Sequence, residues 1–275
     1  MCRVVSDASN APRTMLPRQI LRFMGANDSA IAQRASDNDL LLKFAAGLIR
    51  PTMARALGII MLDTTFARPR GDAGNAASWP FPVLIERVSG ARPEPVVAGW
   101  FDDVQPFLDA AFRLVQRGAC AITTTCGFLV RHQQRLQREL PVPVLTSTLT
   151  QFARLQAALG AQQHVAILTI AATALDSSVR NLAGIGIDVL VFALPRDSHF
   201  VSAVLGASVA LDTVRAEREW VALATACLRD HPGIGLWLFE CANMPPYAAA
   251  VSRVTGLPVL DALTLGRELY AMAKS

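Results

Sequence analysis

From residue 57 onward, short apolar segments alternate with longer segments in which apolar residues recur every three to four positions. The short segments predict strands covered on both faces, and the longer segments predict amphipathic helices. Strands are expected at Leu57–Leu62, Pro95–Ala98, Ala119–Thr124, Val142–Leu145, Val165–Thr169, Asp188–Phe192, Gly235–Phe239 and Val259–Leu260. Helices are expected at Val104–Arg117, Val130–Leu140, Thr148–Leu159, Ser177–Leu182, Val214–Arg229 and Pro246–Thr255. This alternation predicts an α/β fold with mostly parallel sheets.

The chain contains an internal repeat at a spacing of 115 residues. At this spacing Cys126 repeats as Cys241, and the tripeptide Pro-Val-Leu at 143–145 repeats at 258–260. Each copy reads glycine, apolar strand, cysteine, amphipathic helix and second strand. The repeat predicts two similar α/β lobes, each with one cysteine at the carboxyl end of a strand where a helix begins.

The repeat also suggests how the chain divides. Residues 1–55 show no convincing strand and mix polar residues with proline, so we expect a poorly packed N-terminal extension. We assign residues 56–150 together with 251–275 to the first lobe, and residues 151–250 to the second.

Composition narrows the class of protein. The 275 residues are 52% hydrophobic, yet no apolar stretch reaches the roughly 18 residues of a membrane span. The net charge is +4, but only two of the 26 basic residues are lysines, and the arginines are scattered among acidic residues. Nucleic-acid binders concentrate basic residues on one face or tract. We therefore expect neither a nucleic acid nor a membrane as partner.

The cysteines argue against a disulfide framework and against a metal site. The five cysteines form no CxxC pair, and the four histidines are isolated from them and from one another. The odd number and the absence of a recognisable secretory signal favour a reducing compartment. We expect a cytoplasmic protein without a bound metal.

Cys126 and Cys241 are the candidate reactive groups. Ligands of α/β proteins bind beyond the carboxyl ends of the strands, where both cysteines are predicted to lie. A helix N-terminus lowers a thiol pKa from about 8.5 toward neutrality. Two thiols flanking a carbon acid can remove a proton on one face and return one on the other. A buried cysteine is more often a small hydrophobe, which is the role expected for Cys120 and Cys227, but the repeat-matched placement of the pair favours chemistry.

Three segments resemble the aspartate/glutamate racemase superfamily, which includes amino-acid and hydantoin racemases, maleate isomerase and arylmalonate decarboxylase. They are Leu57–Thr65, Gly118–Phe128 and Gly235–Tyr247. The resemblance implies two pseudo-symmetric Rossmann-like lobes, an interlobe cleft, no cofactor and a homodimer. It places Cys126 and Cys241 at the positions of the two catalytic cysteines.

The resemblance also implies residues that bind a small carboxylate or related carbon-acid substrate. Asp63 falls where many racemases carry an acidic residue that holds the substrate or orients a cysteine. Thr169 and Thr173 resemble a threonine-rich loop that contacts substrate.

The residues after the two cysteines depart from the family pattern. Gly127 and Phe128 stand where amino-acid racemases have Asn-Thr, so oxygen-binding groups are sought in Thr124, Thr125 and the backbone N–H of Gly127. Asn243 occupies the place of a common histidine, and it can donate a hydrogen bond but cannot exchange a proton as histidine does. These departures weaken an assignment of glutamate as substrate.

Two further features remain open. The segment Ala67–Asn75 either meets an anionic substrate through Arg68, Arg70 or Asn75, or is an ordinary solvated loop. Glu240 is either a carboxylate near Cys241, which would raise the thiol pKa, or a helix-start or surface residue.

Together these features predict a cofactor-independent racemase or isomerase of an amino-acid or hydantoin-type carbon acid that uses both cysteines. The alternatives are a single-cysteine decarboxylase or cis–trans isomerase of the same superfamily, and a non-catalytic protein that binds a small ligand.

Overall fold

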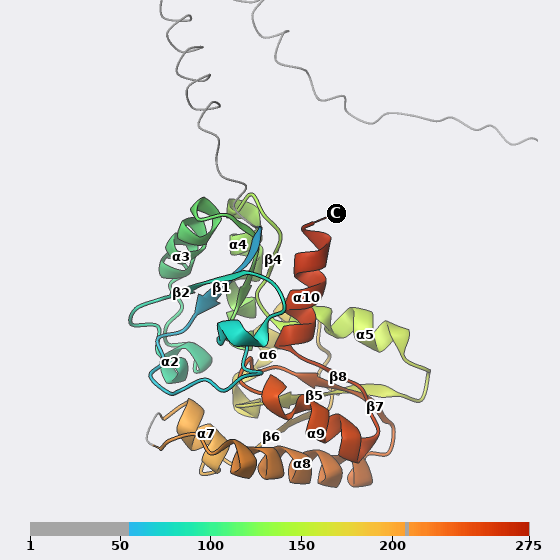
Figure 1. Cartoon of the computed structure of the whole chain (residues 1–275). Helices are drawn as coiled ribbons and strands as arrows, with labels where there is room; N and C mark the ends of the chain where they lie inside the picture. The colour runs from blue at the N-terminus through green and yellow to red at the C-terminus, as the bar shows by residue number, and fades with distance from the viewer. Residues whose placement is uncertain (1–54, 207–208, 275) are drawn as a thin grey trace, which may run out of the picture. The chain divides into compact units, whose positions relative to one another are not determined.

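The computed structural model describes residues 55–206 and 209–274, which form two lobes, each built around a four-stranded parallel sheet (Figure 1). The first sheet has the order β2-β1-β3-β4, with strands β1 Ala56–Met61, β2 Val83–Arg87, β3 Ala119–Thr124 and β4 Val144–Leu145. The second has the order β6-β5-β7-β8, with strands β5 His164–Thr169, β6 Val191–Ala193, β7 Ile234–Phe239 and β8 Val259–Leu260. The predicted two-lobed α/β fold is confirmed. The predicted extension lies outside the described residues except for its last residue, and so does Cys2.

The internal repeat is visible in the two sheets. Strands β3 and β7 are separated by the repeat spacing, and so are β4 and β8. Their registers match as well, because Ile122 pairs with Val144 in one sheet and Trp237 pairs with Val259 in the other. Each lobe therefore has the same strand order and ends its third strand just before a cysteine.

The helices of the first lobe cover both faces of its sheet. They are η2 Ala76–Ser78, α2 Pro93–Val97, α3 Gln105–Gln116, η3 Gly127–His132, α4 Gln133–Glu139 and α10 Ala262–Met272. Leu57 and Ile59 of β1 lie in the same apolar cluster as Leu269 of α10. Ile60 lies in the cluster that contains Phe107 of α3. Because successive strand residues face opposite sides, a wholly apolar β1 is buried on both faces.

The second lobe is covered by seven helical segments within the described residues. They are η4 Thr148–Gln151, α5 Phe152–Ala158, η5 Ala172–Ala174, α6 Ser177–Ala183, α7 His199–Val204, α8 Thr213–Asp230 and α9 Pro245–Thr255. Helices α8 and α9 run side by side (Figure 1). The ring of Phe200 makes edge contacts with the rings of Trp220 on α8 and Tyr247 on α9. This aromatic contact fixes α9, which follows Cys241 in the chain.

Two predictions of local structure need correction. Pro95–Ala98, expected as a strand, lies largely in α2, because Pro93 occupies the first helical turn and the apolar pair Val96–Val97 is buried as a helical face. The second strand of the first sheet is instead β2, which is only half buried. The assignment of residues 251–275 to the first lobe also changes, because β8 pairs with β7 in the second sheet and only α10 returns to the first.

Two features are absent from the part of the chain that the structure describes. No helix there is both long and apolar enough to cross a membrane. No group of three or more histidine, cysteine, aspartate or glutamate residues in that part is placed to hold a metal ion.

Candidate active site

Cys126 and Cys241 come from different lobes and lie close together. Cys126 follows β3 directly after Thr125 and is the N-cap residue of η3. Cys241 follows β7 after Glu240. They are 6% and 5% exposed, and a negative charge on Cys126 would raise the pKa of Cys241. The two thiols therefore share one buried site between the lobes.

The prediction that these thiols have lowered pKa values is wrong. Burial, and next the charge of Glu240, raises the pKa of Cys126 to about 12. The same two causes raise the pKa of Cys241. The backbone N–H groups of Phe128 and Leu129 act in the opposite direction on the pKa of Cys126, but more weakly than burial. In the absence of a bound cation, both groups are thiols at neutral pH.

Glu240 is a buried carboxyl that joins the lobes. Its Oε2 accepts a hydrogen bond from Thr169 Oγ1 at 2.8 Å, and the backbone N–H groups of Gly127 and Ile170 also donate to it. Burial raises the pKa of Glu240 to about 7. A Cβ at position 127 would overlap Oε1 of Glu240 and stand 2.6 Å from its carbonyl oxygen. Glycine after Cys126 therefore makes room for Glu240, and this glycine was the sequence signal for the contact.

The loop after β1 carries a second buried carboxylate, Asp72, into the site. The loop crosses to the second lobe, where the Ala73 N–H donates to the Ala242 carbonyl at 3.1 Å. Asp72 is fully buried and accepts hydrogen bonds from Arg68 Nη1, Gly74 N and Asn243 Nδ2, each at 2.7 Å.

Asn243 continues these contacts to the thiol. The S–H of Cys241 donates to Asn243 Oδ1, with 3.4 Å between the heavy atoms. The interpretation of this segment as an ordinary solvated loop is wrong at Asp72, which is buried. Sequence reasoning missed Asp72 because its partner Asn243 lies 171 residues away.

Two polar atoms in this region have unused hydrogen-bonding capacity. The Arg68 side chain is 8% exposed, and its Nη2 donates to Thr64 Oγ1 at 3.1 Å. Its buried Nε finds no hydrogen-bond partner among the described residues, and neither does the buried hydroxyl of Tyr247. Burial, and next the charges of Asp72 and Cys241, raise the pKa of Tyr247, which places its hydroxyl near these two residues. Such unpaired groups call for a partner.

Thr124 and Thr125 use their hydroxyl groups to hold strand ends. Thr124 Oγ1 donates to the Thr146 carbonyl at 2.7 Å and accepts from the Cys126 N–H at 3.2 Å. Thr125 Oγ1 accepts from the Leu62 N–H at 3.2 Å. Both side chains thus position Cys126 through the backbone.

Asp63 and Thr173 lie outside the hydrogen-bonded network around the cysteines. Asp63 accepts a hydrogen bond from the Gly90 N–H at 2.9 Å and lies 3.9 Å from Arg87. Thr173 is exposed on η5. The network around the two cysteines contains six of the other residues that the sequence singled out: Arg68, Thr124, Gly127, Thr169, Glu240 and Asn243.

A cavity of about 430 Å³ opens beside this network. Its lining comes from the loops after β1 and around α2 in the first lobe and from the end of α7 in the second. Thr64 belongs both to its wall and to the contacts of Arg68. The volume suits a small ligand.

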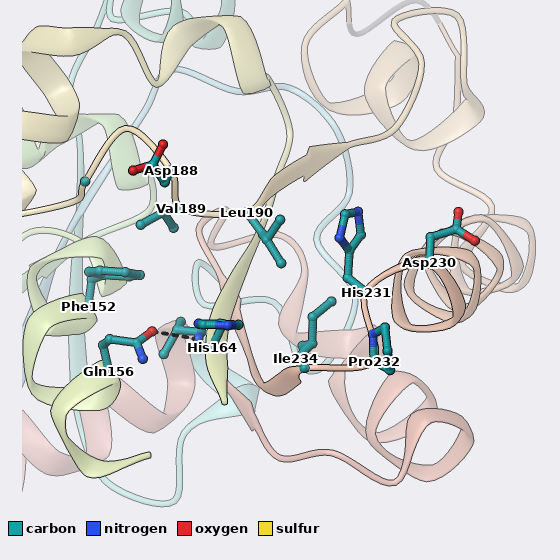
Figure 2. A pocket seen from close by; sticks show the side chains of 13 residues that line it. Phe152, Gln156, His164, Asp188, Val189, Leu190, Asp230, His231, Pro232 and Ile234 are labelled. Carbon is teal, nitrogen blue, oxygen red and sulfur yellow. Dashed lines mark hydrogen bonds between the residues drawn. The ribbon is translucent and has the colours of Figure 1, made fainter. Parts of the chain in front are cut away.

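A larger cavity of about 610 Å³ lies elsewhere, near the amino-terminal ends of β5 and β7. Figure 2 shows His164, His231 and Asp230 around it, at the opposite end of the second sheet from Cys241. Since ligands of parallel sheets bind at the carboxyl ends of the strands, we place the candidate site at the two cysteines.

No family model matches the chain. By sequence, it is 29% identical over 221 residues to a dimethylsulfoniopropionate lyase of Durusdinium sp. clade D, covering 76% of this chain and 71% of that protein. It is 30% identical over 228 residues to dimethylsulfoniopropionate lyase 6 of Emiliania huxleyi (strain CCMP1516), covering 78% of this chain. The match spans only 59% of the length of that second relative.

By structure, the chain resembles the allantoin racemase of Pseudomonas fluorescens with a TM-score of 0.54 at 19% identity, over 79% of this chain and 89% of that one. It resembles a glutamate racemase of Bacillus anthracis with a TM-score of 0.50 at 15% identity, over 80% of this chain and 82% of that one. At these identities the likeness shows the fold.

The predicted activity is corrected by these comparisons. We expected a racemase or isomerase, but the curated sequence relatives are lyases. The decarboxylase, cis–trans isomerase and binding-protein alternatives do not describe these relatives either. The chain has the fold of the aspartate/glutamate racemase superfamily, and in sequence it resembles dimethylsulfoniopropionate lyases.

Proposed function

We propose that this protein is a lyase that cleaves dimethylsulfoniopropionate or a close sulfonium analogue. The observation that carries the proposal is the pair of buried thiols around Glu240, in a chain whose sequence relatives are named for that activity. The substrate is a three-carbon carboxylate with a dimethylsulfonium group on C3, so the hydrogens on C2 lie next to a carboxylate.

The reaction needs one base. A cysteine thiolate takes a proton from C2, and the electrons of that C–H bond form the C2–C3 double bond. The C3–S bond breaks with its electron pair remaining on sulfur, so dimethyl sulfide leaves and acrylate remains. The protonated cysteine then returns its proton to solvent. A weakly acidic C–H bond requires a strong base, and a thiolate of raised pKa is stronger than an ordinary one.

The charges in the site favour a cationic substrate. Glu240 is a buried carboxyl whose charge raises the pKa of both thiols, whereas the charge of Asp72 is already paired with Arg68. A sulfonium cation acts in the opposite direction, because a nearby positive charge favours the thiolate. The substrate therefore supplies the charge that generates its base. An amino-acid carboxylate alone would not do this.

The test is the release of dimethyl sulfide and acrylate from dimethylsulfoniopropionate by the purified full chain. Dimethyl sulfide is measured by headspace gas chromatography, and acrylate by proton NMR. Wild type is compared with Cys126→Ser and Cys241→Ser. Cys227→Ser is the matched control, because Cys227 is also 6% exposed but lies in α8.

We expect equimolar products from wild type and from the control, and a loss of about 10³-fold in the variant that lacks the base. The proposal is abandoned if wild type releases neither product, or if both site variants retain the wild-type rate.

A further inference from the structure

The two thiols have different hydrogen-bonding surroundings. Around Cys126 the backbone N–H groups of Phe128 and Leu129 and the charge of Arg131 act to lower the thiol pKa, while the Leu129 N–H donates its hydrogen bond to the Cys126 carbonyl. The Cys241 thiol instead donates its proton to an amide oxygen, Asn243 Oδ1. Donors stabilise a thiolate, whereas an acceptor stabilises the thiol.

The orientation of the Asn243 amide is determined by its other neighbour. Its Nδ2 donates to Asp72 Oδ2 at 2.7 Å. Rotating the amide by half a turn would place its oxygen against that carboxylate, with no hydrogen between the two acceptors. The other carboxylate oxygen, Oδ1, is held by Arg68 and Gly74. The amide oxygen must therefore face Cys241.

We propose that the contacts from Arg68 through Asp72 to Asn243 hold Cys241 as a thiol and leave Cys126 as the only base of the site. Asp72 and Asn243 are then positioning residues that act through Cys241. The claim that Cys126 performs the elimination rests on the proposed lyase function. The claim about which thiol ionises first does not depend on any substrate.

The remaining charges do not remove this difference. Glu240 raises the pKa of both thiols, so it does not choose between them. Asp72 and a charged Cys126 both raise the pKa of Cys241 further. The N–H of Asn243 lowers the pKa of Cys241, but the same residue also presents the oxygen that accepts the thiol proton.

The first experiment follows the ionisation of each thiol without a reagent that must enter the buried site. The full chain is labelled with cysteine carrying ¹³C at Cβ, and its NMR spectrum is recorded as a function of pH. Signals are assigned with Cys126→Ser and Cys241→Ser. At the highest pH at which the protein stays folded, we expect a larger ionised fraction of Cys126 than of Cys241, because the pKa of Cys126 is already raised to about 12. If Cys241 titrates first, the proposal is overturned.

The Asn243→Ala variant tests the cause of the difference. Removing the acceptor should move the Cys241 titration down by about one pH unit and leave that of Cys126 within a few tenths. A folded variant with an unchanged Cys241 titration contradicts the role of Asn243. Asp72→Asn should shift Cys241 in the same direction, both because it frees the amide to turn and because it removes a negative charge that raises the pKa of Cys241. Asn243→Ala keeps that charge, so it is the variant that isolates the acceptor.

The second experiment uses wild type alone and needs no variant to fold. Dimethylsulfoniopropionate carrying one deuterium on C2 is supplied in each configuration, and the acrylate is analysed by mass spectrometry. A single base predicts that one enantiomer loses its deuterium and the other keeps it. Loss from both to equal extents overturns the single-base assignment. Absence of any acrylate would defeat the proposed function, while the thiol titration would still decide this inference.

Discussion

The regions around Cys126 and Cys241 begin from the same repeat and end in different chemistry. Both cysteines follow the third strand of a parallel sheet. Cys126 caps η3 directly, whereas Cys241 stands four residues before Pro245, where α9 begins. The first arrangement places the amino-terminal end of η3 next to the thiol, and its N–H groups act to lower the thiol pKa. The second leaves room for Asn243 to present an amide oxygen. The repeat thus determines where the thiols lie, and the residues that follow determine their protonation.

The residues on either side of the cysteines differ in the same way. Thr125 precedes Cys126 and bonds the backbone of its own lobe, but the equivalent Glu240 reaches across to the other lobe. Gly127 follows Cys126 because no Cβ fits beside Glu240, while Ala242 follows Cys241 at the equivalent position. One carboxyl therefore accounts for two departures from symmetry.

Gly127→Ala should have the largest effect on the difference between the two cysteine regions. The added Cβ would overlap Glu240, so the lobes must separate or the carboxyl must leave its hydrogen bonds. We expect about 3 kcal/mol lower stability in urea unfolding and at least a hundredfold loss of the proposed lyase activity. Ala242→Gly, at the repeat-related position, is the matched control and should cost about 1 kcal/mol. Equal effects of the two substitutions would contradict the special role of glycine at 127.

Glu240→Gln should change the pH dependence of stability. The folded protein keeps the Glu240 proton up to about pH 7, whereas the usual pKa of this carboxyl is 4.5. Between these values the folded state binds more protons than the unfolded state, so this group lowers stability as pH rises. We expect about 3 kcal/mol of stability to be lost in wild type across that window, and this part of the slope to be missing in the variant.

Chemical unfolding at a series of pH values from 4 to 8 measures this difference. Thr169→Val serves as the control, because it removes one hydrogen bond to Glu240 but keeps the titrating carboxyl. A wild-type slope identical to that of Glu240→Gln would mean that the carboxyl is ionised in the folded protein throughout.

Arg68→Lys should have an intermediate effect, confined to the contacts that lead to Cys241. The guanidinium contacts Asp72 and Thr64 through different nitrogens, which a lysine ammonium cannot reproduce. We expect about a tenfold fall in kcat of the proposed reaction, measured as dimethyl sulfide release. Arg70→Lys in the same loop is the control, because Arg70 is exposed. If both variants fall equally, Arg68 has no particular role in holding Asp72.

Sequence patterns predicted best the elements whose burial is evident from their own residues. Strand β3 has the predicted bounds, because its run of apolar residues and two threonines is buried on both faces almost throughout. Strand β2 was missed because it is half buried at the sheet edge, so its apolar signal is weaker. The repeat located both cysteines without any structural information.

The rest of the site depends on contacts between distant residues. Asp72 lies in a segment rich in glycine and charge, which is typical of a solvated loop, and only its contact with Asn243 reveals its burial. The direction of the thiol pKa was misjudged for the same reason. A helix N-terminus is visible in sequence, but the burial of Cys126 and its proximity to Glu240 are not.

Asp63→Asn should have the smallest effect. It tests whether a carboxylate of the first lobe contributes to activity on the Cys126 side. The side chain of Asp63 is one-third exposed, and its hydrogen bond from Gly90 can be kept by an amide oxygen. We expect less than a twofold change in lyase activity and a stability change within about 0.5 kcal/mol. Steady-state kinetics at two salt concentrations measure the change in activity. The higher salt concentration screens the weak ion pair between Asp63 and Arg87. A tenfold loss of activity would mean that Asp63, which lines the cavity of about 430 Å³, contacts the substrate as the family resemblance implied.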